Sequence, residues 1–525
     1  MKQLQVTNLF RKTLCALLAT LLAASLCGCS GGSDGENGFQ ALFKLDGTGD
    51  SASEPREPTP VTELDLPYDP SDTHGGRIFD PYYCQTSANR YICALVYDPL
   101  FRIDGSYQPQ PCIAESAEYS SVALSEHETA YFCVVTLREG ALFSDGDEVT
   151  AADVLYSISL AMAKDSVFAT KLSNVVSYTR SEPNRITFRL HSPDAMFASL
   201  LCFPIVKKGS GDNQAYVGSG RYRPILVGES VRLLQNEHYS GSGPIRLISL
   251  VEVEDGNMLM YGLKTGSIDF AFFDFSADMS YSAASGSQLV QLNNMIFIGV
   301  NGYSRQLADA AVRRAVSLTI DRSALVSAYS GMATAAYTPQ NPLFSNAKPD
   351  APDRDAAEAL LTQAGFERDE EGFFAKRDRR LTLRLLVNSE DDRRIAAASL
   401  IAEQLNEVGL ETELVEKPFS EYSALLAAGD YDLYLGELRL KYNMSIAALL
   451  PGGQAAYSTA ADEEFMAAYL KWRSGGSLGS FNSAFAEQTP FIPLLFRCGL
   501  VSFSRSLSYD IVSTEQDIFY NIIDW

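Results

Sequence analysis

Residues 131–161 constrain the fold of this chain more than any other segment, because they predict a strand, a turn and a capped helix in succession. Apolar and polar side chains alternate over 131–138 with the period of a half-buried strand. The Asp-Gly pair at 145–146 then predicts a turn, because glycine accepts a positive φ and aspartate bonds its own backbone. Thr150 and Asp153 have the spacing of a capping box, so we expect a helix to begin there.

The rest of the chain predicts a mixed α/β architecture. Alternating or apolar patterns predict strands over 186–190, 231–235, 245–253, 293–301, 381–387, 411–415 and 432–435. Helical periodicity covers 308–329, 353–365 and 392–408, and the last two of these segments end at glycines. Strands that alternate with helices in this way indicate βαβ units.

The N-terminus carries signals of export and lipidation. An apolar stretch at 13–26 follows three basic residues and is too short to span a bilayer. It leads into Leu-Cys-Gly-Cys, which resembles a lipobox with Cys29 as the lipidated residue; an ordinary secretory signal, cleaved by another peptidase, is the alternative. We expect 1–28 to be a lipoprotein signal peptide. Segment 29–62, rich in Gly, Ser, Pro and acidic residues, is predicted to be a flexible tether.

Composition excludes some classes of function. The formal net charge of −23 argues against nucleic acid as a partner, because phosphate binding needs a basic face. The four histidines have no neighbouring partner in a recognised nucleophile or zinc motif, so we expect no enzyme activity, no cofactor and no directly bound transition metal.

Six cysteines lie beyond the N-terminal segment and show no spacing typical of a zinc site. Export permits disulfides, whereas the apolar surroundings of some of these residues favour buried thiols, and the sequence leaves both possibilities open. The six are Cys84, Cys93, Cys112, Cys133, Cys202 and Cys498.

Short motifs follow one another through the chain in a fixed order. They are LVYDPL at 95–100, PCIAES at 111–116, LREG at 137–140, FSDG at 143–146, TAADV at 150–154, VGSGRY at 217–222, LKTGSID at 263–269, RRAV at 313–316 and IDR at 320–322. In this order they resemble the motifs of the family 5 extracellular solute-binding proteins, the peptide- and nickel-type receptors of ABC importers. The resemblance extends over about residues 75–525.

This resemblance implies an α/β, two-lobed, periplasmic-binding-protein-like (Venus flytrap) fold, with an extra small β-rich domain inserted in the first lobe. The corresponding division assigns 63–100, 217–299 and 490–525 to lobe I, 101–216 to the inserted domain II, and 300–489 to lobe III.

It also implies a function. We expect a monomeric, lipid-anchored receptor on the outer face of the cytoplasmic membrane, at the cell surface or in the periplasm. It would deliver an oligopeptide or a similar small polar solute to the permease subunits of an ABC importer. The alternative is a surface lipoprotein of the same fold that serves signalling or chaperoning without transport. The third hypothesis is an unrecognised hydrolase.

One departure from the family pattern bears on the ligand. Many peptide-binding relatives have a tryptophan and an aspartate after the strand predicted at 432–435, and that aspartate pairs with the amino terminus of the peptide. Here Glu437 and Leu440 stand at those positions, so free amino termini should be poorly preferred unless Glu437 takes over the role. The guanidinium of Arg439 suits a carboxylate or phosphate, although Glu437 and Arg439 could instead pair with each other or with other lobe residues.

The predicted ligand site has two sides. Glu437, Arg439 and Tyr442 should line the second lobe's side of the cleft, because ligands collect beyond the carboxyl ends of strands in open α/β sheets. The resemblance places Tyr83 and Asn89 opposite them. It also places Asn301, after the predicted hinge strand, near the cleft.

Overall fold

The computed structural model describes residues 61–525, except 78, 212–213, 229, 275–285, 348–350, 505–506 and 508–509. The predicted signal peptide, Cys29 and almost all of the predicted tether therefore lie outside the described residues. Within the described part of the chain, no helix is both long and apolar enough to cross a membrane.

Strands from distant parts of the chain build one four-stranded sheet. β1 (Glu63–Tyr68) runs parallel to β10 (Leu247–Glu252), and the antiparallel strands β9 (Ser230–Gln235) and β8 (Tyr222–Val227) follow in that order. Helix α2 (Ser87–Val96) packs against this sheet. The chain thus leaves the sheet after β1 and returns to it at β8.

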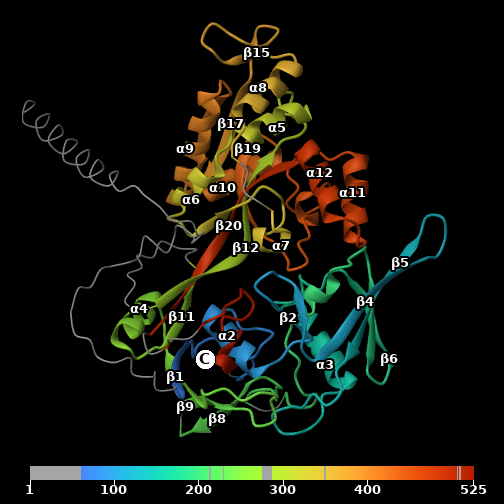
Figure 1. The fold of residues 1–525 in the computed structure, drawn as a ribbon, viewed down its shortest axis with the longest axis vertical. Coiled ribbons are helices and arrows are strands. Elements are labelled where there is room, and N and C mark those ends of the chain that lie inside the picture. Colours follow the sequence, from blue (N-terminus) through green and yellow to red (C-terminus); the bar gives the residue numbers. More distant parts are fainter. Residues whose placement is uncertain are drawn as a thin grey trace, which may run out of the picture. The chain divides into compact units, whose positions relative to one another are not determined.

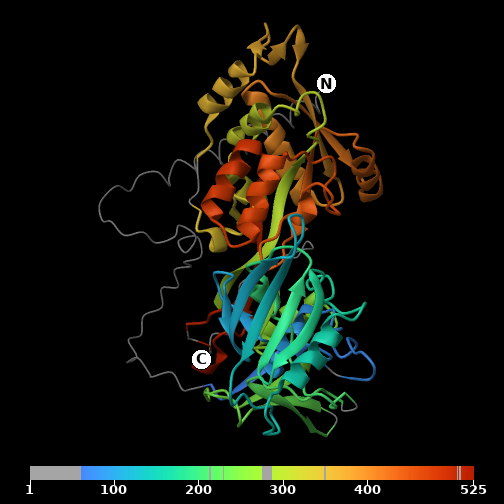
Figure 2. The same cartoon turned by 90° about the vertical axis from the view of Figure 1, so that its right-hand side faces the viewer.

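The segment between β1 and β8 contains a second, antiparallel sheet. Its order is β4 (Ala114–Ala123), β5 (Thr129–Leu137), β7 (Arg185–Leu190) and β6 (Val175–Glu182), and Figure 2 shows its strands in cyan and green. A small hairpin of β2 (Phe101–Ile103) and β3 (Pro109–Pro111) precedes it.

The strand, turn and capped helix predicted over 131–161 are confirmed. β5 covers the alternating run, and Gly146 has a φ of 89°. Helix α3 (Ala151–Ala161) begins with the capping box, in which the Thr150 N–H donates to Asp153 Oδ2 at 2.9 Å.

One apolar core joins the two sheets of this first lobe. Buried residues from both sheets, from α3 and from the C-terminus belong to the same cluster, among them Leu66, Val154, Phe188, Ile248 and Trp525. The strand pairing and the shared core show which segments pack together, whereas the residue boundaries of the domains stay predictions.

A third, mixed sheet has the order β11, β20, β12, β19, β17 and β18, with β13 paired to β20. The bounds are β11 (Phe270–Phe273), β12 (Gly286–Val300), β13 (Ala333–Ala335), β17 (Thr382–Asn388), β18 (Glu411–Lys417), β19 (Leu433–Arg439) and β20 (Phe491–Phe503).

The long strands β12 and β20 connect the two lobes. One half of β20 pairs with β11 and the start of β12, while the other half of β12 pairs with β19 (Figure 1). The register between β12 and β20 shifts between Gln291 and Met295, close to the middle of their contact. The strands of the second lobe are therefore continuous with strands that reach the first.

Helices surround the sheet of the second lobe, and α5, α8 and α9 lie beside β17 and β19 in Figure 1. Their side chains and those of the sheet form a second apolar core that includes Val316, Leu385, Ile401, Leu433 and Ile492. The remaining elements are α4 (Gly256–Thr265), α5 (Ala310–Thr319), α6 (Arg322–Ala328), α7 (Pro342–Ser345), α8 (Arg354–Gln363), α9 (Asp392–Glu407), α10 (Phe419–Ala428), α11 (Glu463–Arg473), α12 (Leu478–Gln488), the short strands β14 (Glu367–Arg368), β15 (Phe374–Lys376) and β16 (Arg379–Arg380), and the single turns η2 (Phe197–Leu200), η3 (Ala447–Leu449) and η4 (Ile522–Asp524).

Two expectations about these elements need correction. The helical pattern over 308–329 is divided, because Ile320 is extended and the Asp321 carboxylate caps a new helix, α6. The strand predicted over 432–435 continues as β19 to Arg439, because it pairs with β12 as far as Asn294. Glu437 thus lies within a strand and not in the loop that follows it.

Candidate functional site

Arg439, the last residue of β19, lies where three cavities meet. The first cavity, of about 120 Å³, has walls from α2, the loop after α3 and the C-terminal segment. The second, of about 800 Å³, lies between segments 170–200 and 438–473. The third, of about 320 Å³, is lined by residues of β12, α9, β19 and β20.

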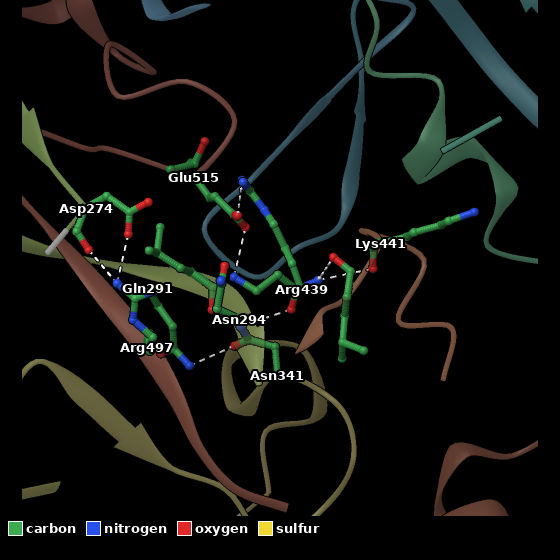
Figure 3. Close-up of polar contacts among 12 residues, drawn as sticks. Asp274, Gln291, Asn294, Asn341, Arg439, Lys441, Arg497 and Glu515 are labelled. Carbon is green, nitrogen blue, oxygen red and sulfur yellow. Dashed lines mark hydrogen bonds and ion pairs between the residues drawn. The ribbon is translucent and has the colours of Figure 1, made fainter. Parts of the chain in front are cut away.

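Arg439 is held by Glu515 of the C-terminal segment. Its Nη2 donates to Glu515 Oε1 at 2.6 Å, as Figure 3 shows, and the carboxylate raises the pKa of the guanidinium. The other oxygen of Glu515 accepts from Tyr107 Oη at 3.2 Å and from the Asn293 N–H at 3.0 Å. The Arg439 side chain is nevertheless 50% exposed, so part of it faces the cavities.

Glu437 is engaged by three neighbours. Its carboxylate accepts from Asn294 Nδ2 at 2.8 Å, Arg394 Nη2 at 2.9 Å and Arg497 Nη1 at 3.0 Å. Burial would raise the pKa of Glu437, but Arg497, Asn294 and Arg394 outweigh burial and lower it. Of the alternatives left open by the sequence, the structure shows pairing with other residues, and Glu437 and Arg439 do not pair with each other.

Tyr442 lies in the first cavity beside a lysine. The Tyr442 side chain is buried, its ring centroid is 6.0 Å from that of Tyr107, and burial raises its pKa. Lys171 Nζ lies 5.3 Å from the Tyr442 centroid and 5.1 Å from that of Phe168. Glu437, Arg439 and Tyr442 thus all line cavities, and their contacts with a ligand stay predictions.

The other three predicted residues do not line these cavities. Asn301 Nδ2 donates to the carbonyls of Gly429 and Tyr431, and Asn89 exchanges hydrogen bonds with the backbone of Asp69. Tyr83 stacks on His74 with a centroid distance of 3.8 Å. Their contacts with a ligand stay predictions.

Leu440 is buried in an apolar cluster with Tyr107, Tyr442 and Met444. An apolar side chain in this position offers no acceptor to a ligand's ammonium group. The expectation that free amino termini are poorly preferred stays a prediction.

The sequence alone does not indicate the charged residues that the first lobe contributes to the first cavity. Arg90 on α2, Lys171 after α3 and Glu515 near the C-terminus all line the first cavity. The predicted C-terminal return to the first lobe could have indicated Glu515. Nothing in the local sequence distinguishes Lys171 from any other lysine on a loop.

The walls of the second cavity contact each other directly. The buried Asp194 pairs with the buried Arg473 and accepts from Asn443 Nδ2 at 2.7 Å. Lys441 Nζ donates to the carbonyl of Thr170 at 2.6 Å. These contacts join segments of the first lobe to α11 and the loop after β19.

The reactive side chains near the cavities have few activating partners among the described residues. Burial raises the pKa of the Cys202 thiol in the first cavity, which keeps the sulfur protonated and a poor nucleophile. Among the described residues, no group of three or more His, Cys, Asp or Glu side chains is placed to hold a metal ion.

The sequence leaves open whether the six cysteines beyond the N-terminal segment form disulfides. In this structure all six are free thiols.

Two lobes joined by long strands define the periplasmic-binding-protein fold, and the predicted fold class is confirmed. The model of the bacterial extracellular solute-binding proteins, family 5 Middle, matches residues 108–452. The chain belongs to this family.

Individual relatives are more distant. The chain is 26% identical over 371 residues to protein XP55 of Streptomyces lividans, covering 65% of this chain and 67% of that protein. It is 23% identical over 381 residues to the oligopeptide-binding protein AppA of Bacillus subtilis, covering 66% of this chain and 68% of that protein. The crystal structure of a nickel ABC transporter from Bacillus halodurans superposes with a TM-score of 0.71 at 18% identity, covering 87% of this chain and 98% of that one, which shows the shared fold.

Proposed function

We propose that this protein is a lipid-anchored receptor that delivers an oligopeptide or a similar small polar solute to the permease subunits of an ABC importer. The observation that carries the proposal is the set of three cavities that share Arg439, within a chain of the family 5 solute-binding proteins. The largest, of about 800 Å³, falls within the range of roughly 300–1,000 Å³ typical of small-molecule sites. The name of the relative AppA supports a peptide as the ligand.

The mechanism is closure of two lobes on the solute. A ligand that contacts both walls stabilises the arrangement in which the walls meet, and the permease then receives the loaded form. Arg439 and Tyr442 come from the second lobe, while Arg90 and Lys171 come from the first, so a solute in the first cavity contacts both. Glu437 acts by fixing Arg394 and Arg497 around the third cavity.

Native mass spectrometry of the protein purified from its own host tests the receptor. We expect a small solute to co-purify, and we expect a thermal-shift screen of short peptides to contain stabilising compounds. A protein that carries no solute and gains no stability from any compound would contradict the receptor and favour a signalling or chaperoning lipoprotein.

The lipid anchor has its own test. We propose Cys29 as the lipidated residue and the following segment as a tether on the outer face of the membrane. Wild-type protein should incorporate a labelled fatty acid and sediment with membranes, whereas Cys29→Ser should do neither. Cys27→Ser is the matched control and should behave as wild type; a labelled Cys29→Ser protein would contradict the assignment.

A further inference from the structure

The three cavities that share Arg439 have a charge opposite to that of the whole chain. Their described lining residues include nine lysines and arginines but only five aspartates and glutamates, whereas the chain carries a net charge of −23. Ionic screening at physiological salt limits the field of exposed surface charges to about 8 Å, so the local excess dominates inside the cavities.

Each carboxylate in the cavity walls already has a cationic partner. Glu515 pairs with Arg439 at 2.6 Å, Asp517 with Arg221 at 2.6 Å, and Asp194 with Arg473. Glu437 and Asp391 both pair with Arg394, at 2.9 Å and 3.3 Å. These groups are therefore occupied, and none is left as a ready acceptor for the ammonium group of a ligand.

Three of the cations have no such partner. No carboxylate of the described residues lies within ion-pair distance of Arg90, Lys171 or Lys441. Lys171 Nζ lies over the rings of Phe168 and Tyr442, and burial lowers its pKa. Lys441 donates only to neutral oxygens, the Thr170 carbonyl at 2.6 Å and Ser173 Oγ at 3.0 Å.

An ammonium group withdrawn from water without a counter-charge is costly, and an anion placed beside it removes that cost. Arg90 and Lys171 line the first cavity, Lys441 lines the second, and Arg439 lines both. Two separate cationic positions thus lie along the space available to a ligand.

We propose that the ligand is an acidic solute with at least two anionic groups, one bound by Lys171 and Arg90 and another by Lys441. This inference rests on the proposed receptor function and specifies its ligand class. Because Leu440 and the paired carboxylates leave no site for an ammonium group, the same walls select against cationic solutes.

Calorimetric titration of the purified chain with four probes tests the inference. The probes are triglutamate, trialanine, trilysine and citrate. At least one of the two acidic probes should bind tenfold or more tightly than trialanine, the binding should weaken at high salt, and trilysine should not bind.

Variants identify the residues. Lys171→Gln and Lys441→Gln should each weaken binding of the acidic probe tenfold or more, while Lys171→Arg should retain most of it. Lys164→Gln removes the same charge from the same segment, at an exposed position outside the cavities, and should leave the affinity unchanged. Unchanged melting temperatures would show that the variants fold.

Several outcomes separate this inference from the receptor function. Tighter binding of trialanine or trilysine, or equal affinities of Lys171→Gln and Lys164→Gln, would overturn the acidic ligand and leave the receptor intact. If citrate binds and triglutamate does not, the result would support an acidic ligand and exclude a peptide as that ligand. If none of the probes binds, the acidic ligand is overturned. The receptor function is then tested only by whether a solute co-purifies with the protein.

Discussion

Two carboxylates organise the arginines around the candidate site. Glu515 is almost fully buried and fixes Arg439 from the first lobe, while Glu437 draws together Arg394 of α9 and Arg497 of β20. Arg497 also bonds Asp274 at 2.9 Å, as Figure 3 shows. Orientation of the cavity's cations therefore depends on side chains that need not touch the ligand.

Substitution Glu437→Gln should destabilise the fold by roughly 1–3 kcal/mol at neutral pH, because it removes the more buried carboxylate contact of Arg394 and Arg497 and leaves them only Asp391 and Asp274. The pKa of Glu437 lies below its ordinary value of 4.5, so its stabilising effect is complete above that pH and is lost as pH falls through the lowered pKa.

Urea denaturation of wild type and variant between pH 3 and pH 7 measures this difference, with about 4 as the pH near which it should begin to fade. Glu413→Gln, on the exposed face of β18, is the control and should change stability little. A wild-type advantage that grows towards acid pH would contradict the assigned role.

At the scale of elements, most local signals predict the structure, although the Asp321 cap that divides the helix predicted over 308–329 is an exception. The capping box of α3 and the helix stop at Gly365 are set by neighbouring residues, and both are confirmed. The end of β19 was placed too early, because its extension depends on pairing with β12. The candidate site shows the same limit, because the local sequence indicates Arg439 but not its partner Glu515, which comes from the distant C-terminal segment.

The motif VGSGRY at 217–222 is explained by the approach of two elements. It leads into β8, and the Gly220 N–H donates to the carbonyl of Val96, the last residue of α2, at 2.9 Å. A Cβ at Gly220 would lie 2.5 Å from the Leu95 carbonyl oxygen. Only glycine allows the backbones to come this close.

Gly220→Ala should therefore cost about 1–3 kcal/mol of folding free energy, as overpacking does elsewhere. Thermal unfolding measures the loss. Gly105→Ala is the matched control, because a Cβ there meets no atom within 4 Å and the substitution should be nearly neutral. Equal stability of the two variants would show that α2 and β8 can separate at little cost.

For the whole molecule, the proposed receptor function requires the walls of the cavities to separate and meet again. In this structure they meet through the buried Asp194–Arg473 pair and through Ala195, whose N–H donates to the Arg473 carbonyl at 2.7 Å. A Cβ at Gly475 would lie 3.5 Å from Ala195 Cβ, a separation at which disulfides form. A covalent link between Ala195 and Gly475 should therefore hold the walls together.

The double variant Ala195→Cys with Gly475→Cys should, once oxidised, retain a bound solute that its reduced form releases. The positive φ of Gly475 (97°) adds strain of about 1–3 kcal/mol, so the reduced form should be slightly less stable than wild type. Protein loaded with its co-purified solute is oxidised and transferred to solute-free buffer, and native mass spectrometry then measures how much solute stays bound.

Each single variant is a control and should release the solute as wild type does. If a fully oxidised double variant releases its solute as fast as the reduced form, the solute leaves without separation of these walls, and closure between Asp194 and Arg473 does not gate the site.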